Sequence, residues 1–166
     1  YKIKAQFNAG RMTSTSAKVD PKSISERKCF LCVENLPAEQ KGILYNDKYI
    51  ILCNPFPIFP EHFTLTYKEH IPQRILDTFS DMLDLSKDLS KHYSVIYNGP
   101  RCGASAPDHL HFQAGNKFFM TIDDEFHQIK NEYGKVIYED DDLSFYAIDD
   151  GVRKFVSIES LDKELV

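Results

Sequence analysis

A chain of 166 residues is long enough to fold as one domain with a substantial core, and its hydrophobic and charged fractions of 42% and 27% are those of an ordinary globular protein. The net charge of −5 argues against broad electrostatic binding of nucleic acid, although an acidic chain can still hold a small nucleotide in a local cationic pocket. No apolar run approaches the ~20 residues that span a bilayer and no signal peptide is recognisable, so we expect no membrane association and a cytoplasmic location.

The first third of the chain passes from a polar segment to predicted strands. Residues 1–25 are rich in Ser, Thr and Lys and are expected to form a loosely ordered arm. Two hydrophobic runs at 43–45 and 49–53 flank a turn and predict a hairpin. The next segment, 54–60, contains three prolines, which cannot donate hydrogen bonds within a sheet, so it is predicted to be a rigid loop. A further strand is predicted at 63–67.

The middle of the chain contains the strongest helical pattern. Between Pro72 and Tyr93, apolar residues recur at helical spacing while acidic residues occupy the other face. A strand at 94–98 then leads into a loop of small and turn-forming residues, and another strand follows at 109–113. One long helix packed on an antiparallel sheet predicts an α+β domain, which we place at residues 26–120.

The remaining residues, 121–166, are predicted to form a C-terminal extension. Within it, residues 136–140 (VIYED) are similar to residues 43–47 (ILYND), and each segment is followed by another apolar run. The extension is therefore interpreted as the start of a second, truncated copy of the same structural unit.

The cysteines favour metal binding over a disulfide framework, because there are four of them in a chain of this size and two are closely spaced. Cys29 and Cys32 have the spacing that lets two thiolates share one zinc ion, whose tetrahedral site needs two further ligands. The spacing leaves open which histidines would complete the site. The candidates are His62, His70, His92, His109, His111 and His127. Buried unreactive cysteines are the main alternative, and a redox dithiol is less favoured because no thioredoxin-like context follows.

The segment 109–113 carries the clearest functional pattern. Side chains on a strand alternate between its faces, so His109, His111 and Gln113 are expected to point the same way. The preceding loop, 98–108, consists mostly of residues whose backbone N–H groups can approach a bound anion closely. Aligned imidazoles beside such a loop predict chemistry at phosphorus, and packed non-catalytic histidines are the alternative.

Two segments resemble the histidine-triad superfamily in its transferase branch. Residues 103–113 (GASAPDHLHFQ) are similar to the motif of that branch, in which glutamine replaces the last histidine of the hydrolases. Residues 54–70 (NPFPIFPEHFTLTYKEH) are similar to a strand-loop-strand of its phosphorylases. The branch includes galactose-1-phosphate uridylyltransferase, diadenosine tetraphosphate phosphorylase and GDP-hexose phosphorylases. The resemblance covers roughly residues 29–113 and implies a HIT-like antiparallel sheet with one long packed helix.

The resemblance also implies a structural zinc ion and a set of substrate contacts. The residues that match the zinc ligands of the uridylyltransferases are Cys29, Cys32, His70 and His109. Asn98 and Ser105 match positions that contact phosphate, and Asn54 matches a position near the ribose. Arg101 lies in the same loop, where we expect it to contact phosphate. Asp108 departs from the pattern, because an acidic group beside a phosphate is unfavourable unless it faces away and supports a neighbouring residue.

By the same resemblance, His111 is the expected nucleophile. It would attack the α-phosphorus of a nucleotide or nucleotide-sugar and form a covalent nucleotidyl-histidine, with its other nitrogen donating to a backbone carbonyl. Gln113 would bond a phosphate oxygen and cannot deliver a proton to water, which favours transfer to a phosphate or sugar phosphate over hydrolysis. The resemblance further implies that two copies can pair as a homodimer. The alternatives are a histidine-triad nucleotide hydrolase and a non-catalytic, zinc-stabilised nucleotide-binding module.

Overall fold

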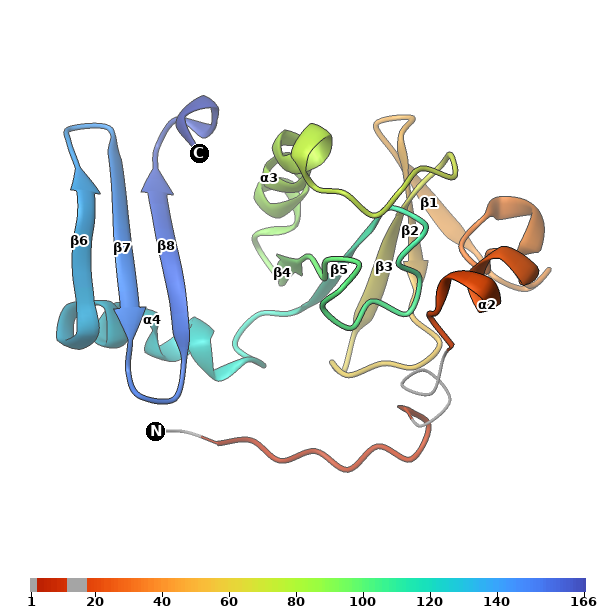
Figure 1. The fold of residues 1–166 in the computed structure, drawn as a ribbon, viewed down its shortest axis with the longest axis horizontal. Coiled ribbons are helices and arrows are strands. Elements are labelled where there is room, and N and C mark those ends of the chain that lie inside the picture. The colour runs from red at the N-terminus through yellow and green to blue at the C-terminus, as the bar shows by residue number, and fades with distance from the viewer. Residues whose placement is uncertain (1–2, 12–17) are drawn as a thin grey trace. The chain divides into compact units, whose positions relative to one another are not determined.

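The computed structural model describes residues 3–11 and 18–166, which divide into two compact units. One unit comprises residues 5–117, and the other comprises residues 118–166 together with the first few residues of the chain. Both units combine antiparallel strands with helices (Figure 1), so the predicted α+β class is confirmed. Among the described residues, no helix is both long enough and apolar enough to cross a bilayer.

The unit of residues 5–117 is built on a five-stranded antiparallel sheet with the order β1-β2-β3-β5-β4. Its strands are β1 (Gly42–Tyr45), β2 (Tyr49–Cys53), β3 (His62–Tyr67), β4 (Tyr93–Ile96) and β5 (His111–Asn116). The turn between β1 and β2 places Asn46 and Asp47 at positive φ, which short polar side chains tolerate. The hairpin predicted at 43–53 is therefore present.

Helices of this unit lie before and between the strands. Those that lie wholly within the described residues are α2 (Pro21–Glu26), the short 3₁₀ helices η1 (Val33–Asn35) and η2 (Leu76–Thr78), and α3 (Phe79–Leu89). Asp20 caps α2, because its carboxylate accepts a hydrogen bond from the Ser23 N–H at 3.0 Å. Of the helix predicted between residues 72 and 93, the α-helical part is α3.

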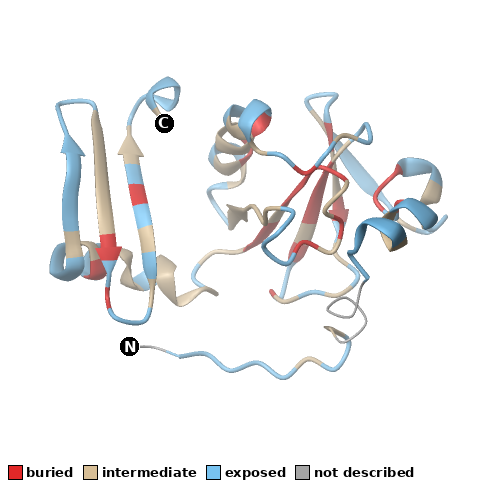
Figure 2. Cartoon of the chain, in the orientation of Figure 1, coloured by how far each residue is buried: buried red, intermediate tan, exposed pale blue. Residues whose placement is uncertain are grey.

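The two faces of the sheet have different surroundings. Phe112 and Ala114 of β5 lie in the core that includes Leu85 of α3, and all three are fully buried. Because side chains alternate along a strand, His111 and Gln113 lie on the opposite face. Figure 2 shows the buried residues concentrated in this central sheet and the segment that leads into β5. The fold thus places apolar packing on one face of β5 and polar groups on the other.

The strand that carries the predicted motif begins two residues later than expected, at His111. The chain before it leaves the sheet at Leu110, whose carbonyl still accepts from the Tyr67 N–H at 2.9 Å but whose N–H donates to the Ile71 carbonyl at 2.8 Å and not to β3. His109 therefore lies outside the strand, in a turn, and is fully buried. His109 therefore does not share a strand face with His111 and Gln113, contrary to the expectation from the sequence.

The unit of residues 118–166 contains a helix that the sequence analysis did not predict. It comprises α4 (Thr121–Tyr133), the three-stranded antiparallel sheet β6 (Gly134–Glu139), β7 (Leu143–Asp149) and β8 (Lys154–Ser160), and η3 (Lys163–Leu165). The Lys130 ammonium lies 4.1 Å from the centre of the Tyr146 ring and 2.7 Å from the Glu159 carboxylate, so it joins α4 to the sheet. The interpretation of this region as a truncated second copy stays a prediction.

Candidate active site and metal centre

The sheet face opposite α3 borders a cavity of about 460 Å³, a volume typical of small-molecule sites. The sequence-predicted residues that line it are Asn54, Asn98, Ser105, His111 and Gln113. The fold therefore brings together polar groups from β5, from the loop after β2 and from the loop between β4 and β5. Arg101 is exposed and does not line the cavity.

One wall of this cavity is apolar. The side chains that form it belong to the segment around η1 and to β2 and β4, and they are Phe30, Leu31, Leu36, Pro37, Leu52 and Ile96. Such a wall suits a flat heterocycle, because it excludes water without demanding a fixed hydrogen-bond partner. The cavity thus has a polar end and an apolar side.

His111 is held in a single tautomer at the polar end. Its Nδ1 lies 2.9 Å from the carbonyl oxygen of His109, which can only accept a hydrogen bond, so Nδ1 carries the proton. Nε2 is then unprotonated and has a lone pair available for bonding. Burial lowers the pKa of His111 below its ordinary value, which keeps the ring neutral. The hydrogen bond expected for a histidine nucleophile is therefore present.

Gln73 fixes the backbone of His111, a role that no motif in the sequence indicates. Its side-chain amide accepts from the His111 N–H at 2.7 Å and donates to the His111 carbonyl at 3.0 Å. The same amide donates to the Asn98 carbonyl at 2.9 Å. Gln73 is only 1% exposed, so these bonds are shielded from water. It ties the start of β5 to the loop that carries Asn98.

His62 contacts Gln113 on the neighbouring strand. The His62 Nδ1 accepts a hydrogen bond from the Ile58 N–H at 3.1 Å, so the proton of the neutral ring is on Nε2. That Nε2 lies 2.8 Å from the Gln113 Oε1 and donates to it. The Gln113 oxygen is thereby occupied, and its amide NH₂ is turned away from His62. From the sequence, His62 was expected only as one of several zinc-ligand candidates.

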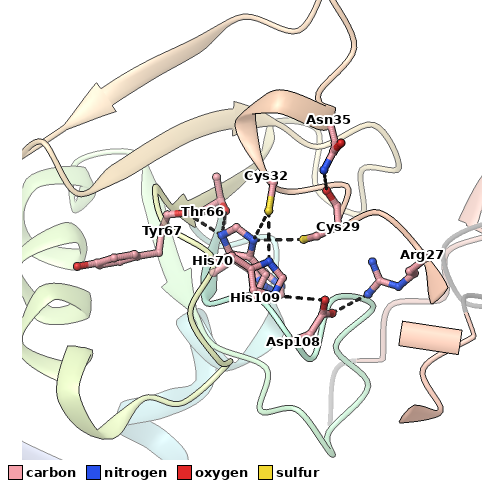
Figure 3. Close-up of polar contacts among 10 residues, drawn as sticks. Arg27, Cys29, Cys32, Asn35, Thr66, Tyr67, His70, Asp108 and His109 are labelled. Carbon is pink, nitrogen blue, oxygen red and sulfur yellow. Dashed lines mark hydrogen bonds and ion pairs between the residues drawn. The ribbon is translucent and has the colours of Figure 1, made fainter. Parts of the chain in front are cut away.

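The four predicted metal ligands come together in a separate, mostly buried cluster (Figure 3). One ligand atom from each of Cys29, Cys32, His70 and His109 lies within 4.8 Å of the others, so the cluster could bind a metal ion. The His109 Nδ1 lies 3.2 Å from the Cys29 sulfur, and the His70 Nδ1 lies 3.2 Å from the Cys32 sulfur. These contacts bring segments about 40 to 80 residues apart in sequence to one point.

The chemistry of the donors fits a zinc ion. The His109 Nε2 donates to the Tyr67 carbonyl at 2.8 Å, which leaves Nδ1 unprotonated and facing the thiols. Burial is the largest influence on both thiols and raises their pKa. When the His109 ring is protonated, its hydrogen bond and its charge, together with backbone hydrogen bonds at Leu31 and Cys32, outweigh burial at Cys29 and lower the pKa of that thiol to about 6. Burial and the neighbouring Cys29 raise the pKa of Cys32 to about 11. A bound cation would offset the repulsion between the two thiolates, because metal ligation favours the deprotonated form of both cysteines.

Asp108 faces this cluster and turns toward basic groups. In Figure 3 its carboxylate lies between the Arg27 guanidinium and His70. One carboxylate oxygen is 2.6 Å from an Arg27 nitrogen, and the other is 3.8 Å from the His70 Nε2. A carboxylate behind a ligating imidazole orients the ring. Asp108 thus supports a neighbouring residue, as the sequence analysis required of an acid at this position.

The chain is similar in sequence to a protein family and to several curated proteins. A family model described as "Domain of unknown function (DUF4922)" matches residues 1–116. The chain is 32% identical over 135 residues to a galactose-1-phosphate uridylyltransferase of Clostridium acetobutylicum, a match that covers 72% of this chain and 26% of that protein. A uridylyltransferase of Halalkalibacterium halodurans is 30% identical over 125 residues, covering 60% of this chain and 24% of that protein. The matched region therefore spans about a quarter of the length of these relatives.

Two solved structures are also similar to this chain. A HIT family hydrolase from Clostridium thermocellum matches with a TM-score of 0.39 and 23% identity, covering 52% of this chain and 85% of that chain. A histidine triad protein from Clostridium difficile matches with a TM-score of 0.38 and 19% identity, covering 55% of this chain and 90% of that chain. The predicted resemblance is confirmed as distant homology to the galactose-1-phosphate uridylyltransferases.

Proposed function

The chain belongs to the family described as "Domain of unknown function (DUF4922)", and from that premise we propose that it is a nucleotidyltransferase or phosphorylase with His111 as its nucleophile. The observation that carries the proposal is the hydrogen bond of the His111 Nδ1 to the His109 carbonyl, beside a cavity of nucleotide size. A neutral imidazole with its proton held on Nδ1 presents the Nε2 lone pair to an electrophile. The distant homology to uridylyltransferases supports the same reaction class.

In the proposed reaction, the His111 Nε2 attacks the α-phosphorus of a nucleotide or nucleotide-sugar. The lone pair forms the N–P bond, and the electron pair of the broken P–O bond leaves with the departing phosphate or sugar phosphate. The His109 carbonyl stabilises the positive charge that develops on the imidazole ring, because it accepts the Nδ1 proton throughout. A phosphate or sugar phosphate then takes the nucleotidyl group from His111.

Gln113 favours transfer over hydrolysis in this scheme. Its oxygen is engaged by His62, so the amide NH₂ is the part that can donate to a non-bridging oxygen of the α-phosphate. An amide has no titratable proton, so it cannot assist water as a histidine can. Asn98 and Ser105 would contact the phosphate from the adjacent loop, and Asn54 would lie near the ribose.

Cys29, Cys32, His70 and His109 would hold a zinc ion with a structural role. A closed tetrahedral site supplies folding energy and no open position for substrate. By holding the His109 side chain, the cluster would keep fixed the backbone carbonyl that sets the tautomer of His111.

The proposal is tested by incubating the protein with a panel of nucleotides and nucleotide-sugars that carry radioactive phosphorus at the α-position. We expect acid-labile label on the protein, no label on His111→Ala, and release of the label by inorganic phosphate or a sugar phosphate. Label that persists in His111→Ala would overturn the mechanism. Release of nucleoside monophosphate without an acceptor would indicate a hydrolase, and tight nucleotide binding without label would indicate a binding module.

A further inference from the structure

The pairing of β4 with β5 stops before it reaches His111. Ile96 and Gln113 form the last pair of this ladder. Continued pairing in the same register would set Asn98 opposite His111, but β4 ends at Ile96 and Asn98 belongs to the loop that follows. All four residues line the cavity, which therefore opens at the point where the ladder ends.

The side-chain amide of Gln73 takes the place of the missing pair. In an antiparallel ladder, the N–H and C=O of one residue bond the same neighbouring strand. Both groups of His111 bond the Gln73 amide instead, because the N–H donates to Oε1 at 2.7 Å and the carbonyl accepts from Nε2 at 3.0 Å. The same Nε2 donates to the Asn98 carbonyl at 2.9 Å. The amide therefore lies between the chain that leaves β4 and the start of β5.

Gln73 is itself fixed in this position by the chain around it. The Gln73 backbone carbonyl accepts a hydrogen bond from the Tyr97 hydroxyl at 3.0 Å. Two residues earlier, the Ile71 carbonyl accepts from the Leu110 N–H at 2.8 Å. Gln73 is almost fully buried, so water does not readily replace its amide between the strands. Residues 71–73 therefore bond the chain on both sides of the gap.

The candidate metal ligands His70 and His109 stand at the other end of the same two segments, each directly before a residue of the backbone bond just described. Their rings lie edge to face, with centres 4.9 Å apart. Residues 70–73 and 109–111 are thus joined at both ends, and Gln73 is the joint that bonds the proposed nucleophile.

We propose that Gln73 is a positioning residue for the reaction of His111. Its amide keeps β4 and β5 apart and so fixes the separation between the nucleophile and the loop that begins at Asn98. This inference rests on the proposed function of His111. Gln73 does not line the cavity, so it acts through the main chain and not through contact with substrate. Movement of the His111 main chain displaces Nε2, and a misplacement of about 1 Å lowers a rate by about a hundredfold.

The first test measures hydrogen exchange by NMR on the full chain and needs no reaction. Gln73→Met keeps a side chain of similar length between the strands but removes all three hydrogen bonds of the amide. We expect the His111 amide proton to exchange about tenfold or more faster relative to that of Ala114, which lies in the same strand. Equal exchange ratios in the wild type and Gln73→Met would overturn the inference.

Thr78→Val is the matched control for both tests. Thr78 is buried, and its hydroxyl donates to the Arg74 and Ile75 carbonyls at 3.4 and 3.3 Å, but it does not line the cavity. This variant should therefore lose stability without a change in the ratio of exchange rates or in the rate of labelling.

The second test measures single-turnover labelling with the α-labelled nucleotide that reacts best with the wild type. Gln73→Met should form the nucleotidyl-protein about a hundredfold more slowly than Thr78→Val, while its dissociation constant for the same nucleotide rises less than about tenfold. Gln73→Glu should be at least as slow, because its carboxylate would face the carbonyl oxygens of Asn98 and His111. A loss of affinity as large as the loss of rate would overturn the inference, because Gln73 would then act in binding.

Tyr97→Phe provides a milder test if Gln73→Met does not fold. It keeps the ring and removes only the bond to the Gln73 carbonyl, so it should slow labelling about fivefold. An unchanged rate would overturn the inference.

The inference and the proposed function fail in different ways. Labelling that depends on His111 but is equally fast in Gln73→Met and Thr78→Val would overturn the inference and leave the proposed function standing. Faster exchange at His111 in Gln73→Met, together with a wild type that never becomes labelled, would support the spacing of the strands by Gln73 and contradict the proposed function.

Discussion

The His62 imidazole donates a hydrogen bond from Nε2 to the Gln113 Oε1 over 2.8 Å, and a backbone group determines the direction of that bond. The Ile58 N–H can only donate, and it lies 3.1 Å from the His62 Nδ1, so Nδ1 must accept. The proton of the neutral ring is then on Nε2, and Gln113 must present its oxygen to it. One main-chain N–H therefore sets the orientation of the Gln113 amide.

This relationship predicts opposite effects for two substitutions of His62. A glutamine side chain can place an N–H donor near the position of the His62 Nε2. An asparagine side chain is shorter and reaches only the position of Nδ1, so it can replace the acceptor there but not the donor to Gln113. We expect His62→Gln to keep the single-turnover labelling rate within about twofold of the wild type. We expect His62→Asn to lower it about tenfold, the upper range for loss of one neutral hydrogen bond.

A double-mutant cycle with Gln113→Ala checks that His62 acts through Gln113. The rate of His62→Asn/Gln113→Ala should equal that of Gln113→Ala, because the bond in question is already absent there. If the double variant were much slower than Gln113→Ala, His62 would have a separate role. Equal losses in His62→Gln and His62→Asn would contradict the donor assignment, provided that both variants show the wild-type circular dichroism spectrum.

The same histidine predicts a loss of stability in acid. Burial first, and then the charge of Arg11, lower the pKa of His62 in the folded protein, while the bond to Gln113 acts in the opposite sense. The unfolded chain therefore binds a proton more readily than the folded one, and stability falls as the pH falls. The contribution of His62 is complete above about pH 6.5, the ordinary value, and is lost as the pH falls through the lowered folded-state pKa.

Urea unfolding between pH 8 and pH 5 would measure this effect. We expect the free energy of unfolding of His62→Gln to decline less steeply below about pH 6.5 than that of the wild type. His92→Gln serves as the matched control, because His92 is exposed in the turn that follows α3. The assignment fails if the wild type and His62→Gln decline in parallel while His92→Gln departs from both.

The local parts of this fold could be predicted from the sequence, and the long-range contacts could not. The hairpin at β1 and β2 follows from two hydrophobic runs on either side of a turn. By contrast, nothing in the spacing of Cys29 selects His109 over the other histidines, because their contact joins segments 80 residues apart. Only the family resemblance pointed to that pair. The irregular chain before β5, which shifts the start of the strand to His111, depends on the bond from the Leu110 N–H to the Ile71 carbonyl and has no local signal.

Two other differences between the expectations from the sequence and the structure have distinct causes. Arg101 was expected at the phosphate because it lies in the loop beside the motif, yet closeness in sequence does not place its side chain in the cavity. Arg11 lines the cavity because Gln6 and Arg11 donate hydrogen bonds to carbonyls 52 and 45 residues away, and no pattern in the sequence predicts these contacts. For α4 a signal was present, since Ile122, Phe126 and Ile129 recur at helical spacing and acidic residues occupy the first turn.

The metal centre predicts that zinc and stability are lost together. We expect about one zinc ion per chain by elemental analysis, and Cys29→Ser to lower both the zinc content and the thermal midpoint. Loss of a structural zinc site removes several kcal/mol, which corresponds to a shift of about 10 °C or more in a chain of this size. Cys53→Ser is the control, because Cys53 is exposed and lies outside the cluster. Undiminished zinc in Cys29→Ser would remove this residue from the ligand set.

Gly115 provides a test of the packing that supports His62. It pairs with His62 across β3 and β5, and a Cβ at this position would overlap the buried Phe59 ring. That ring packs edge-on against His62, with ring centres 5.1 Å apart. We expect Gly115→Ala to destabilise the fold by about 1–3 kcal/mol in urea unfolding, the usual cost of overpacking.

Displacement of Phe59 should also disturb His62, so Gly115→Ala should slow labelling even at temperatures where the protein stays folded. Adding Phe59→Leu should recover part of the lost stability, because the smaller side chain relieves the overlap. Gly99→Ala is the matched control, since a Cβ there would meet the Cys102 sulfur at 3.5 Å, an ordinary contact. If Gly115→Ala were as stable as Gly99→Ala, the close packing of Phe59 on β5 could not be what holds His62 in place.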